Sequence, residues 1–424
     1  MELSSRLSYK SNPIDIMRIL VIGINYAPER TSVGPFTTGL CEHLAAQGHE
    51  VTVITAFPYY PEWRIWKEYR GSLHRLETIN NVRVHRVIHY VPRKPSRFLQ
   101  RIAYDLSFTF TAFLGGLFTG KCDLIYCSCP PPTVALAAWA LGRLKGVPYV
   151  IKLTDLASDA ALATGIMRDG ALLKLARKVE AFAYRHALAV VCLCQGFVDR
   201  LARLGIPAEN LRVIPDWADT ERIRPLASDM TFCKGNEIPP EKFIVLHTGN
   251  MGKKQRLINV IQAAELSKEI TELLWVLVGQ GEERTALEHE IAVRGLSNIR
   301  LLPLQPAATL SNVYASAGAL LLNQTATMED AVIPSKLLTY MAAGRPIVAA
   351  VSNRSEVARH IERADCGVVI PAENPRALVD AALQLRLDSS LRQRLGENGR
   401  KYVEANFTKA LVLEEYDQFV NGIV

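Results

Sequence analysis

The sequence lacks the signals of several protein classes. Its eight cysteines include no C-x-x-C pair, which argues against a zinc or redox site and predicts buried, reduced thiols in a cytoplasmic protein. The uncharged, aromatic run from Leu106 to Gly120 is shorter than the ~20 residues needed to span a bilayer. The first sixteen residues are polar and lack the apolar core of a signal peptide, so we expect a loose extension there and no transmembrane helix.

The positive charge of the chain is also not concentrated enough to indicate a nucleic-acid-binding protein. The formal net charge is +7, but the basic residues are dispersed apart from one patch, and no RNA- or DNA-binding motif occurs. A phosphorylated ligand or an acidic membrane surface fits this charge better. With 424 residues, of which 49% are hydrophobic, the chain is long enough for two globular domains that each bury a core.

The first half of the chain alternates apolar strands with helices. The run Arg18–Gly23 is followed by a loop that contains Gly34, then by a helix that stops at Gly48 and by a strand at 51–55. Strand, helix and strand in this order form a βαβ unit, whose ligands bind at the C-terminal ends of the strands. The loop around Gly34 is therefore a candidate contact with a ligand.

A second candidate position in this half follows the predicted strand at 149–153. Thr154 and Asp155 stand at its C-terminal end, where polar side chains tend to face a binding cleft. The alternative is that Asp155 only caps the next helical segment. From these residues alone, both interpretations remain open.

The second half repeats the pattern after a polar, irregular stretch through Pro240. A strand at 243–249 runs into Gly249-Asn250-Met251-Gly252-Lys253-Lys254. Glycines let a phosphate approach the backbone, while lysines neutralise its charge. The next strand ends at Gly279-Gln280-Gly281. The spacing differs from the Gly-Lys-Ser/Thr loop of ATPases, so we expect phosphate binding of another kind.

The stretch from Pro334 to Gly344 predicts a helix whose start faces a ligand. Proline suits the first helical turn, Lys336 adds a positive charge there, and Gly344 marks the end. Unpaired N–H groups at a helix start attract anions. Glu329 and Asp330 lie just before it. A phosphate-bearing ligand is one interpretation, and an ordinary strand-to-helix connection is the other.

One basic patch precedes an apolar, aromatic run. It consists of Arg93, Lys94, Arg97 and Arg101, and it leads into a segment with several phenylalanines. A basic start and an apolar body are typical of a helix that rests on an acidic bilayer. The alternative is a core helix with a solvated basic end.

Five segments in order resemble those of family 4 retaining glycosyltransferases. They are the loop at Gly34, Ile214–Arg222, Thr248–Gln255, Val278–Glu282 and Pro334–Pro346. The chain is most similar to bacterial transferases of O-antigen, capsule or colanic acid assembly, including N-acetyl-fucosamine transferases. The resemblance implies the α/β fold called GT-B, in which two Rossmann-like domains face a central cleft.

Within this fold we expect an acceptor domain at 17–215, a donor domain at 216–407, and a helix at 408–424 that crosses back to the first domain. The resemblance also implies a nucleotide-sugar donor such as a UDP-sugar, retention of anomeric configuration, and no metal cofactor. The acceptor would be a lipid-linked saccharide or another glycan. We expect a cytoplasmic enzyme, with peripheral attachment to the inner membrane face as a further hypothesis.

The implied site residues divide by role. Lys253 and Lys254 would neutralise the diphosphate leaving group, which is an electrostatic contribution to catalysis. Asp155 would also take part in catalysis. Thr154 would face the acceptor. The candidate donor-binding residues are Gly34, Asn250, Gly252, Gly279, Gly281, Glu329, Asp330, Pro334, Ser335, Lys336 and Thr339.

The sequence departs from the family pattern at informative positions. Ala331 and Thr339 stand where two glutamates are usual, and Thr154 stands where many members have histidine. The second glutamate usually holds the ribose, so Thr339 offers only a shorter, neutral hydrogen bond. These departures keep open a non-catalytic, nucleotide-binding partner subunit. A UDP-sugar 2-epimerase of the same fold is a third interpretation, although the carboxylates and histidines that it needs are not clustered here.

Overall fold

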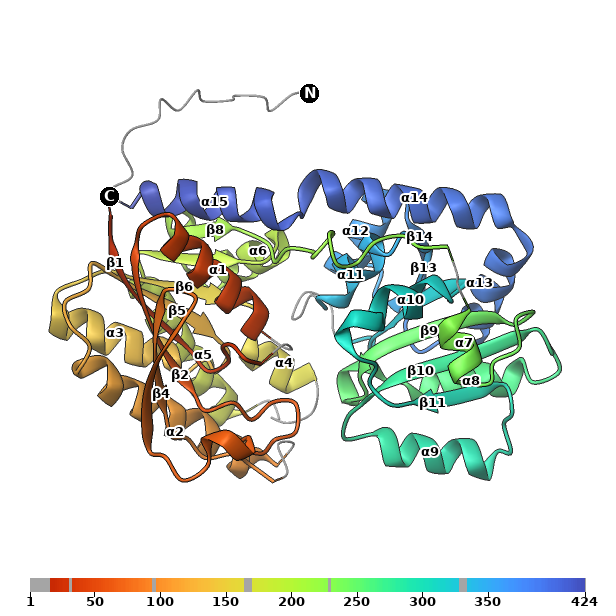
Figure 1. Cartoon of the computed structure of the whole chain (residues 1–424), viewed down its shortest axis with the longest axis horizontal. Coiled ribbons are helices and arrows are strands. Elements are labelled where there is room, and N and C mark those ends of the chain that lie inside the picture. Colours follow the sequence, from red (N-terminus) through yellow and green to blue (C-terminus); the bar gives the residue numbers. More distant parts are fainter. Residues whose placement is uncertain are drawn as a thin grey trace.

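The chain folds into two α/β domains, each built around its own sheet, and two consecutive C-terminal helices lie one along each domain (Figure 1). This arrangement confirms the predicted fold class. The computed structural model describes residues 16–29, 33–93, 97–163, 170–227, 230–327 and 334–423.

The first sheet has eight strands in the order β3-β4-β2-β1-β5-β6-β7-β8, all parallel to their neighbours except the edge strand β3. The strands are β1 (Arg18–Gly23), β2 (Glu50–Ala56), β3 (His74–Ile79), β4 (Val82–Val87), β5 (Leu124–Cys129), β6 (Tyr149–Leu153), β7 (Ala189–Cys192) and β8 (Leu211–Val213). Every residue of β5 and β6 is buried, because helices cover both faces of a parallel sheet.

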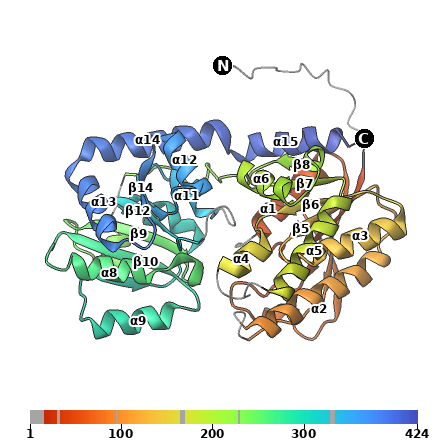
Figure 2. The same ribbon diagram turned by 180° about the vertical axis from the view of Figure 1, so that it is seen from behind.

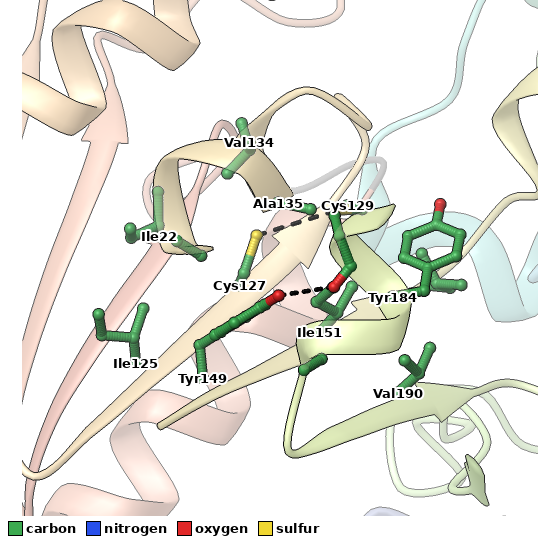
Figure 3. Packing of buried hydrophobic residues seen from close by; sticks show 14 of the residues in the cluster. Ile22, Ile125, Cys127, Cys129, Val134, Ala135, Tyr149, Ile151, Tyr184 and Val190 are labelled. Carbon is green, nitrogen blue, oxygen red and sulfur yellow. Dashed lines mark hydrogen bonds between the residues drawn. The ribbon is translucent and has the colours of Figure 1, made fainter. Parts of the chain in front are cut away.

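Helices form a layer on each face of this sheet. They are α1 (Gly34–Ala46), α2 (Phe98–Leu117), α3 (Val134–Lys145), α4 (Ala157–Ala163), α5 (Ala171–His186) and α6 (Gln195–Arg203). Figure 2 shows α2, α3 and α5 side by side on one face. In the core beneath them the Tyr149 hydroxyl donates to the Ala183 carbonyl at 2.6 Å (Figure 3). Among the described helices, none combines the length and the apolar character that a bilayer crossing requires.

The cysteines lie in these cores and form no disulfides. All eight are buried and free. Cys127 and Cys129, two residues apart on β5, place their sulfur atoms 3.8 Å apart in one hydrophobic cluster. Residues two apart on a strand lie on the same face of a sheet, so both thiols enter one core.

The second sheet is entirely parallel, in the order β11-β10-β9-β12-β13-β14. Its strands are β9 (Phe243–Asn250), β10 (Leu273–Gln280), β11 (Ile299–Leu302), β12 (Ala319–Asn323), β13 (Ile347–Val351) and β14 (Gly367–Pro371). The helices are α7 (Thr231–Gly235), α8 (Ile258–Leu266), α9 (Arg284–Val293), α10 (Leu310–Ala315), α11 (Lys336–Ala342), α12 (Glu356–Ala364) and α13 (Pro375–Leu387).

The strand order indicates where each domain is expected to bind a ligand. In each sheet the order reverses beside the first strand, between β1 and β5 and between β9 and β12. Ligands of open α/β sheets bind beyond the carboxyl ends of the strands at such points. The loops after β9 and β12 are therefore the first place to look for a site in the second domain.

The chain crosses between the domains twice, and the two crossings lie side by side. The Ala218 N–H donates to the Phe407 carbonyl at 2.8 Å, and Ala218 also pairs with Thr408 in a β-bridge. The return path runs through α14 (Ser389–Asn406) and α15 (Lys409–Asn421). α15 packs on the first sheet, where the Tyr126 hydroxyl donates to that of Tyr416 at 3.1 Å.

A buried ion pair lies where the first crossing leaves the sheet. Lys152 Nζ, on β6, is 2.6 Å from Asp216 Oδ1, and the two side chains are only 5% and 11% exposed. The ammonium group also lies 5.6 Å from the ring centre of Tyr416. The pair thus ties the crossing segment to the first sheet and to α15.

Candidate active site

The glycine- and lysine-containing loop after β9 is held in place by the end of β12. The Asn323 amide donates to the Gln255 carbonyl at 2.6 Å, and its oxygen accepts from the Asn259 side chain at 2.8 Å. The Thr325 N–H donates to the Lys254 carbonyl at 3.1 Å. Gly249 has φ of +114°, in the region that favours glycine. Asn323 is thus a supporting residue of this loop, which the sequence analysis missed.

Gly279 and Gly281 allow the end of β10 to approach this loop. A Cβ atom at Gly279 would lie 1.8 Å from the Gly249 carbonyl oxygen, and one at Gly281 would lie 2.3 Å from that of Met251. The Met251 N–H donates to the Gln280 carbonyl at 2.8 Å. These contacts show why the two positions require glycine. Their contact with a donor stays a prediction.

Lys336, in the first turn of α11, extends over the same loop. Its Nζ lies 3.4 Å from Nε2 of His247 and 3.5 Å from where a Cβ of Gly249 would be. Burial lowers the pKa of Lys336 to about 7. Burial, and then the charge of Lys336, hold the pKa of His247 well below its usual range.

The neutral imidazole of His247 can therefore accept a hydrogen bond from Lys336. Its Nδ1 lies 3.3 Å from the Leu321 carbonyl, to which it can donate. His247 is fully buried in the middle of β9 and holds the lysine over the glycine loop. The sequence analysis did not identify it, because it stands inside an apolar strand.

The other predicted residues around α11 are placed as follows. The Pro334 carbonyl accepts from the Leu337 N–H at 3.0 Å, so the first turn begins there. The Thr339 hydroxyl donates to the Ser335 carbonyl of the preceding turn at 3.3 Å. Ser335 is exposed. The predicted donor-binding residues Glu329 and Asp330, and also Ala331, lie outside the described residues.

The first domain meets this loop through Asp155. Lys254 Nζ lies 3.5 Å from Asp155 Oδ2 across the two domains, and the side chains are 33% and 29% exposed. Burial raises the pKa of Asp155, and the charges of Lys254 and Arg101 oppose this rise. The structure thus brings together two of the three residues expected to take part in catalysis. The Thr154 hydroxyl donates to the Cys129 carbonyl at 2.9 Å in a buried position.

Lys253 and Asn250 belong to the same loop as Lys254. Both are exposed, and the charge of Lys253 acts on Glu283, whose pKa burial raises. A Cβ at Gly252 would lie 2.9 Å from the Asn250 side-chain nitrogen. Of the two predicted lysines, Lys254 is the one that contacts the first domain.

The loop after β1 depends on a buried carboxylate that the sequence analysis missed. Glu29 accepts from the N–H groups of Tyr59 and Tyr60 at 2.8 and 2.7 Å and from the Asn25 amide at 2.9 Å. Gly34 follows at the start of α1, where a Cβ would lie 3.1 Å from the Glu29 carbonyl oxygen. Glu29 therefore fixes the ends of this loop.

A second contact also joins the two domains. Glu356 Oε1, at the start of α12, accepts from the Gly196 N–H in the first turn of α6 at 2.9 Å. A carboxylate at a helix N-terminus is favoured by the helix dipole. No group of three or more potential metal-ligating side chains occurs within the described ranges.

The basic patch divides in the structure. Arg93 and Arg97 are exposed, whereas the Arg101 guanidinium lies over the Tyr104 ring, 4.9 Å from its centre, and 3.4 Å from Asp105. Its charge also interacts with that of Asp155, so Arg101 lies at the edge of the candidate site. Lys94 lies outside the described residues.

Known proteins match this architecture along nearly the whole chain. Residues 31–217 match the family described as "Glycosyl transferase 4-like domain", and residues 231–402 match "Glycosyl transferases group 1". A relative in Escherichia coli (strain K12), described as a colanic acid biosynthesis glycosyl transferase, WcaI, is 32% identical over 415 residues, which cover 96% of this chain and all of the relative.

Two solved structures share the fold. Sucrose-phosphate synthase from Thermosynechococcus elongatus superimposes with a TM-score of 0.76 at 18% identity, covering 96% of this chain and 99% of that one. Anabaena HepE in complex with UDP-glucose gives 0.72 at 15% identity, covering 96% and 100%. These two structures, the two family matches and the full-length relative agree with the resemblance that the sequence showed. The chain therefore belongs to the glycosyltransferases, with a group 4-like first domain and a group 1 second domain.

Proposed function

We propose that the protein transfers a hexose-type sugar from a UDP-sugar to a lipid-linked saccharide, with retention, in the assembly of a bacterial surface polysaccharide. The observation that carries the proposal is the contact between Lys254 and Asp155, which joins the glycine loop of the second domain to the strand end of the first. The full-length similarity to a protein named for colanic acid biosynthesis supports the pathway, and HepE in complex with UDP-glucose supports the donor.

The proposed chemistry is electrostatic and needs no metal ion. Lys254 stands in the loop after β9, and Lys336 extends over the same loop from α11. A diphosphate leaving group bound there would meet two ammonium groups, which would stabilise the charge that develops as the glycosidic bond breaks. Lys253 is exposed beside the same loop and would add to the attraction at longer range. Asp155 would face the reacting sugar from the first domain.

The lipid-linked acceptor implies that the enzyme works at the cytoplasmic face of the inner membrane. Arg93 and Arg97 are exposed at the start of α2 and would attract an anionic bilayer. The donor and the acceptor would then reach the site from different sides, the first from solution and the second from the lipid surface.

The test is a transfer assay with purified protein. A panel of UDP-, GDP- and TDP-sugars is combined with an undecaprenyl-diphosphate-sugar acceptor, with and without EDTA, and the anomeric configuration of the product is read by NMR. We expect transfer from a UDP-sugar in EDTA, with the donor configuration retained. Inversion, or transfer that requires a divalent cation, would contradict the corresponding part of the proposal.

A second candidate is a nucleotide-binding partner subunit without activity of its own. Thr339 favours it, because the hydroxyl is already bonded within α11 and stands where the family usually has a ribose-binding glutamate. Binding of UDP without transfer across the whole panel would select this candidate. Lys254→Met separates the two further, since it should lower the rate of transfer roughly 10²–10³-fold in an enzyme, whereas a partner subunit would show only weaker nucleotide binding.

A further inference from the structure

The short helix that follows Asp155 is held by a carboxylate between two arginines. α4 begins two residues after Asp155, and Asp159 stands in its first turn. One carboxylate oxygen of Asp159 lies 2.6 Å from Arg177 Nη2 on α5, and the other lies 2.7 Å from Arg200 Nε on α6. Burial acts to raise the pKa of Asp159, but the hydrogen bonds from Arg200 and Arg177 outweigh it and hold the pKa below its usual value. Asp159 therefore ties α4 to two neighbouring helices.

α4 is too short to be stable without such contacts. It has seven residues, fewer than the ~12–15 below which an isolated helix is marginal in water. A cavity of about 20 Å³ lies where it meets α5 and α6, and Ser158, Glu180 and Arg200 are among the residues that line it. Because packing is incomplete at this junction, the position of α4 depends on the ion pairs of Asp159. The position of Asp155, just before the helix, depends on them as well.

Arg200 connects these ion pairs to the second domain. It stands four residues, about one helical turn, after Gly196, whose N–H donates to Glu356 Oε1 at 2.9 Å. Glu356 starts α12 and is only 4% exposed. Both α4 and α6 lie on the side of the first domain that faces the second (Figure 1, Figure 2). A shift of α6 would therefore move Arg200 and, through it, Asp159.

These contacts and the ion pair of Lys254 with Asp155 form a closed path through both domains. From the second domain the path runs through Glu356 to α6 and Arg200. From there it runs through Asp159 and α4 to Asp155, which faces Lys254 of the second domain. Each step is a hydrogen bond, an ion pair or a short helix, so a change at Glu356 has a continuous physical route to Asp155.

We propose that Asp159 is a positioning residue for Asp155, and that Arg200 links it to the contact that Glu356 makes with α6. The seating of the second domain on α6 thereby sets the position of Asp155 opposite Lys254. The consequence for catalysis rests on the proposed function, in which Asp155 faces the reacting sugar. The mechanical link itself can be measured without donor or acceptor.

The first experiment is hydrogen–deuterium exchange of the full chain, read by mass spectrometry. Glu356→Ala removes the acceptor of the α6 contact, and we expect roughly tenfold faster exchange both at the start of α6 and across 154–159. Glu356→Gln keeps a carbonyl oxygen as acceptor and should exchange like wild type. The matched control is Asp380→Ala, which removes an exposed ion pair with Arg376 inside α13 and should leave both segments unchanged.

The second experiment is a double-mutant cycle on sugar transfer. Arg200→Met breaks the link to α6, while Asp159 keeps its bond to Arg177. Arg200→Met and Glu356→Ala should each lower kcat about tenfold with the KM of the donor nearly unchanged, because Asp155 is misplaced and the donor loop is not. The double variant should lose no more than either single variant. In an Arg177→Met background, which keeps the Arg200 link, Glu356→Ala should have its full effect.

Direct removal of the carboxylate charge completes the test. Asp159→Asn weakens both ion pairs and should lower kcat at least as much as Arg200→Met. Asp199→Asn is its matched control, since this exposed carboxylate accepts from Gln195 on the same helix, and it should leave kcat unchanged.

Two results would overturn the proposal. One is faster exchange in α6 of Glu356→Ala with no change across 154–159. The other is a loss of kcat in Arg200→Met/Glu356→Ala equal to the product of the two single losses, because the residues would then act independently. If wild-type protein transfers no sugar from any donor, the proposed function fails, and the exchange experiment still decides whether the link exists.

Discussion

Replacing Lys254 with methionine tests the contact that joins the two domains. The variant keeps the length of the side chain and removes its charge. Asp155 then loses its partner at 3.5 Å, while its burial is unchanged. If Lys254 neutralises a diphosphate leaving group, removal of one such donor should lower kcat by roughly 10²–10³-fold.

The effect on Asp155 has a definite sign. Burial raises the pKa of this carboxyl, and Lys254 opposes the rise, so removing the lysine raises the pKa further. Two unit charges at this separation interact by ~1 kcal/mol in water and ~5 kcal/mol at an effective dielectric constant of 20. Both side chains are about one third exposed, which favours the lower value and hence a shift of about one pH unit.

The assay is the pH profile of residual kcat in Lys254→Met and wild type. If Asp155 takes part in transfer as the ionised carboxylate, the acidic limb should move to higher pH by about one unit in the variant. Lys253→Met is the matched control, since this exposed lysine does not contact Asp155, and it should lose only a few-fold in kcat. An acidic limb that stays in place would refute the coupling, and near wild-type turnover would refute the leaving-group role.

Three further results are expected. Gly279→Ala, whose methyl group would meet the neighbouring strand end, should weaken UDP binding at least tenfold in calorimetry, whereas Gly235→Ala meets no atom within 4 Å and should change nothing. Lys152→Met breaks the buried pair with Asp216 and should cost about 3–5 kcal/mol in urea unfolding, most of which Lys152→Met/Asp216→Leu should recover. UDP affinity should fall from pH 6 to pH 8.5 as Lys336, with a pKa near 7, loses its charge, and Lys336→Gln should flatten this dependence.

A different observation would contradict each of these three expectations. UDP affinity of Gly279→Ala equal to that of wild type would mean that the end of β10 does not shape the loop after β9. If the Lys152→Met/Asp216→Leu variant were no more stable than Lys152→Met, the loss would come from packing and not from an unpaired charge. A pH dependence of UDP affinity that persists in Lys336→Gln would assign it to another group.

The strands of both sheets could be predicted because a short run of apolar residues identifies a buried strand without knowledge of distant contacts. The runs at 18–23 and 149–153 are almost entirely buried, and Gly48 follows α1 with a φ of +99°, as a glycine after a helix often does. β3 was missed, since this antiparallel edge strand is half exposed and contains charged residues. The short helix α4 was missed as well, because seven residues carry little periodicity.

The site was predicted only where a motif lies within one loop. Asp155 and Lys254 were expected to be functional, but the sequence did not show that they meet, since they are 99 residues apart and lie on different domains. His247, Asn323 and Glu29 support the site through contacts with residues distant in sequence or with backbone atoms. No local pattern distinguishes them from ordinary polar residues, so only the structure could identify them.

The return of α15 to the first sheet affects the order in which the protein can fold during synthesis. The core beneath α1 includes Val412, Tyr416 and Val420 from this helix, although the rest of that core precedes residue 218. The ribosome therefore finishes the whole second domain before it supplies the last piece of the first. A nascent or truncated chain that stops at Phe407 would leave the part of this face that α15 covers exposed, and the earliest domain to emerge would be the last to become stable.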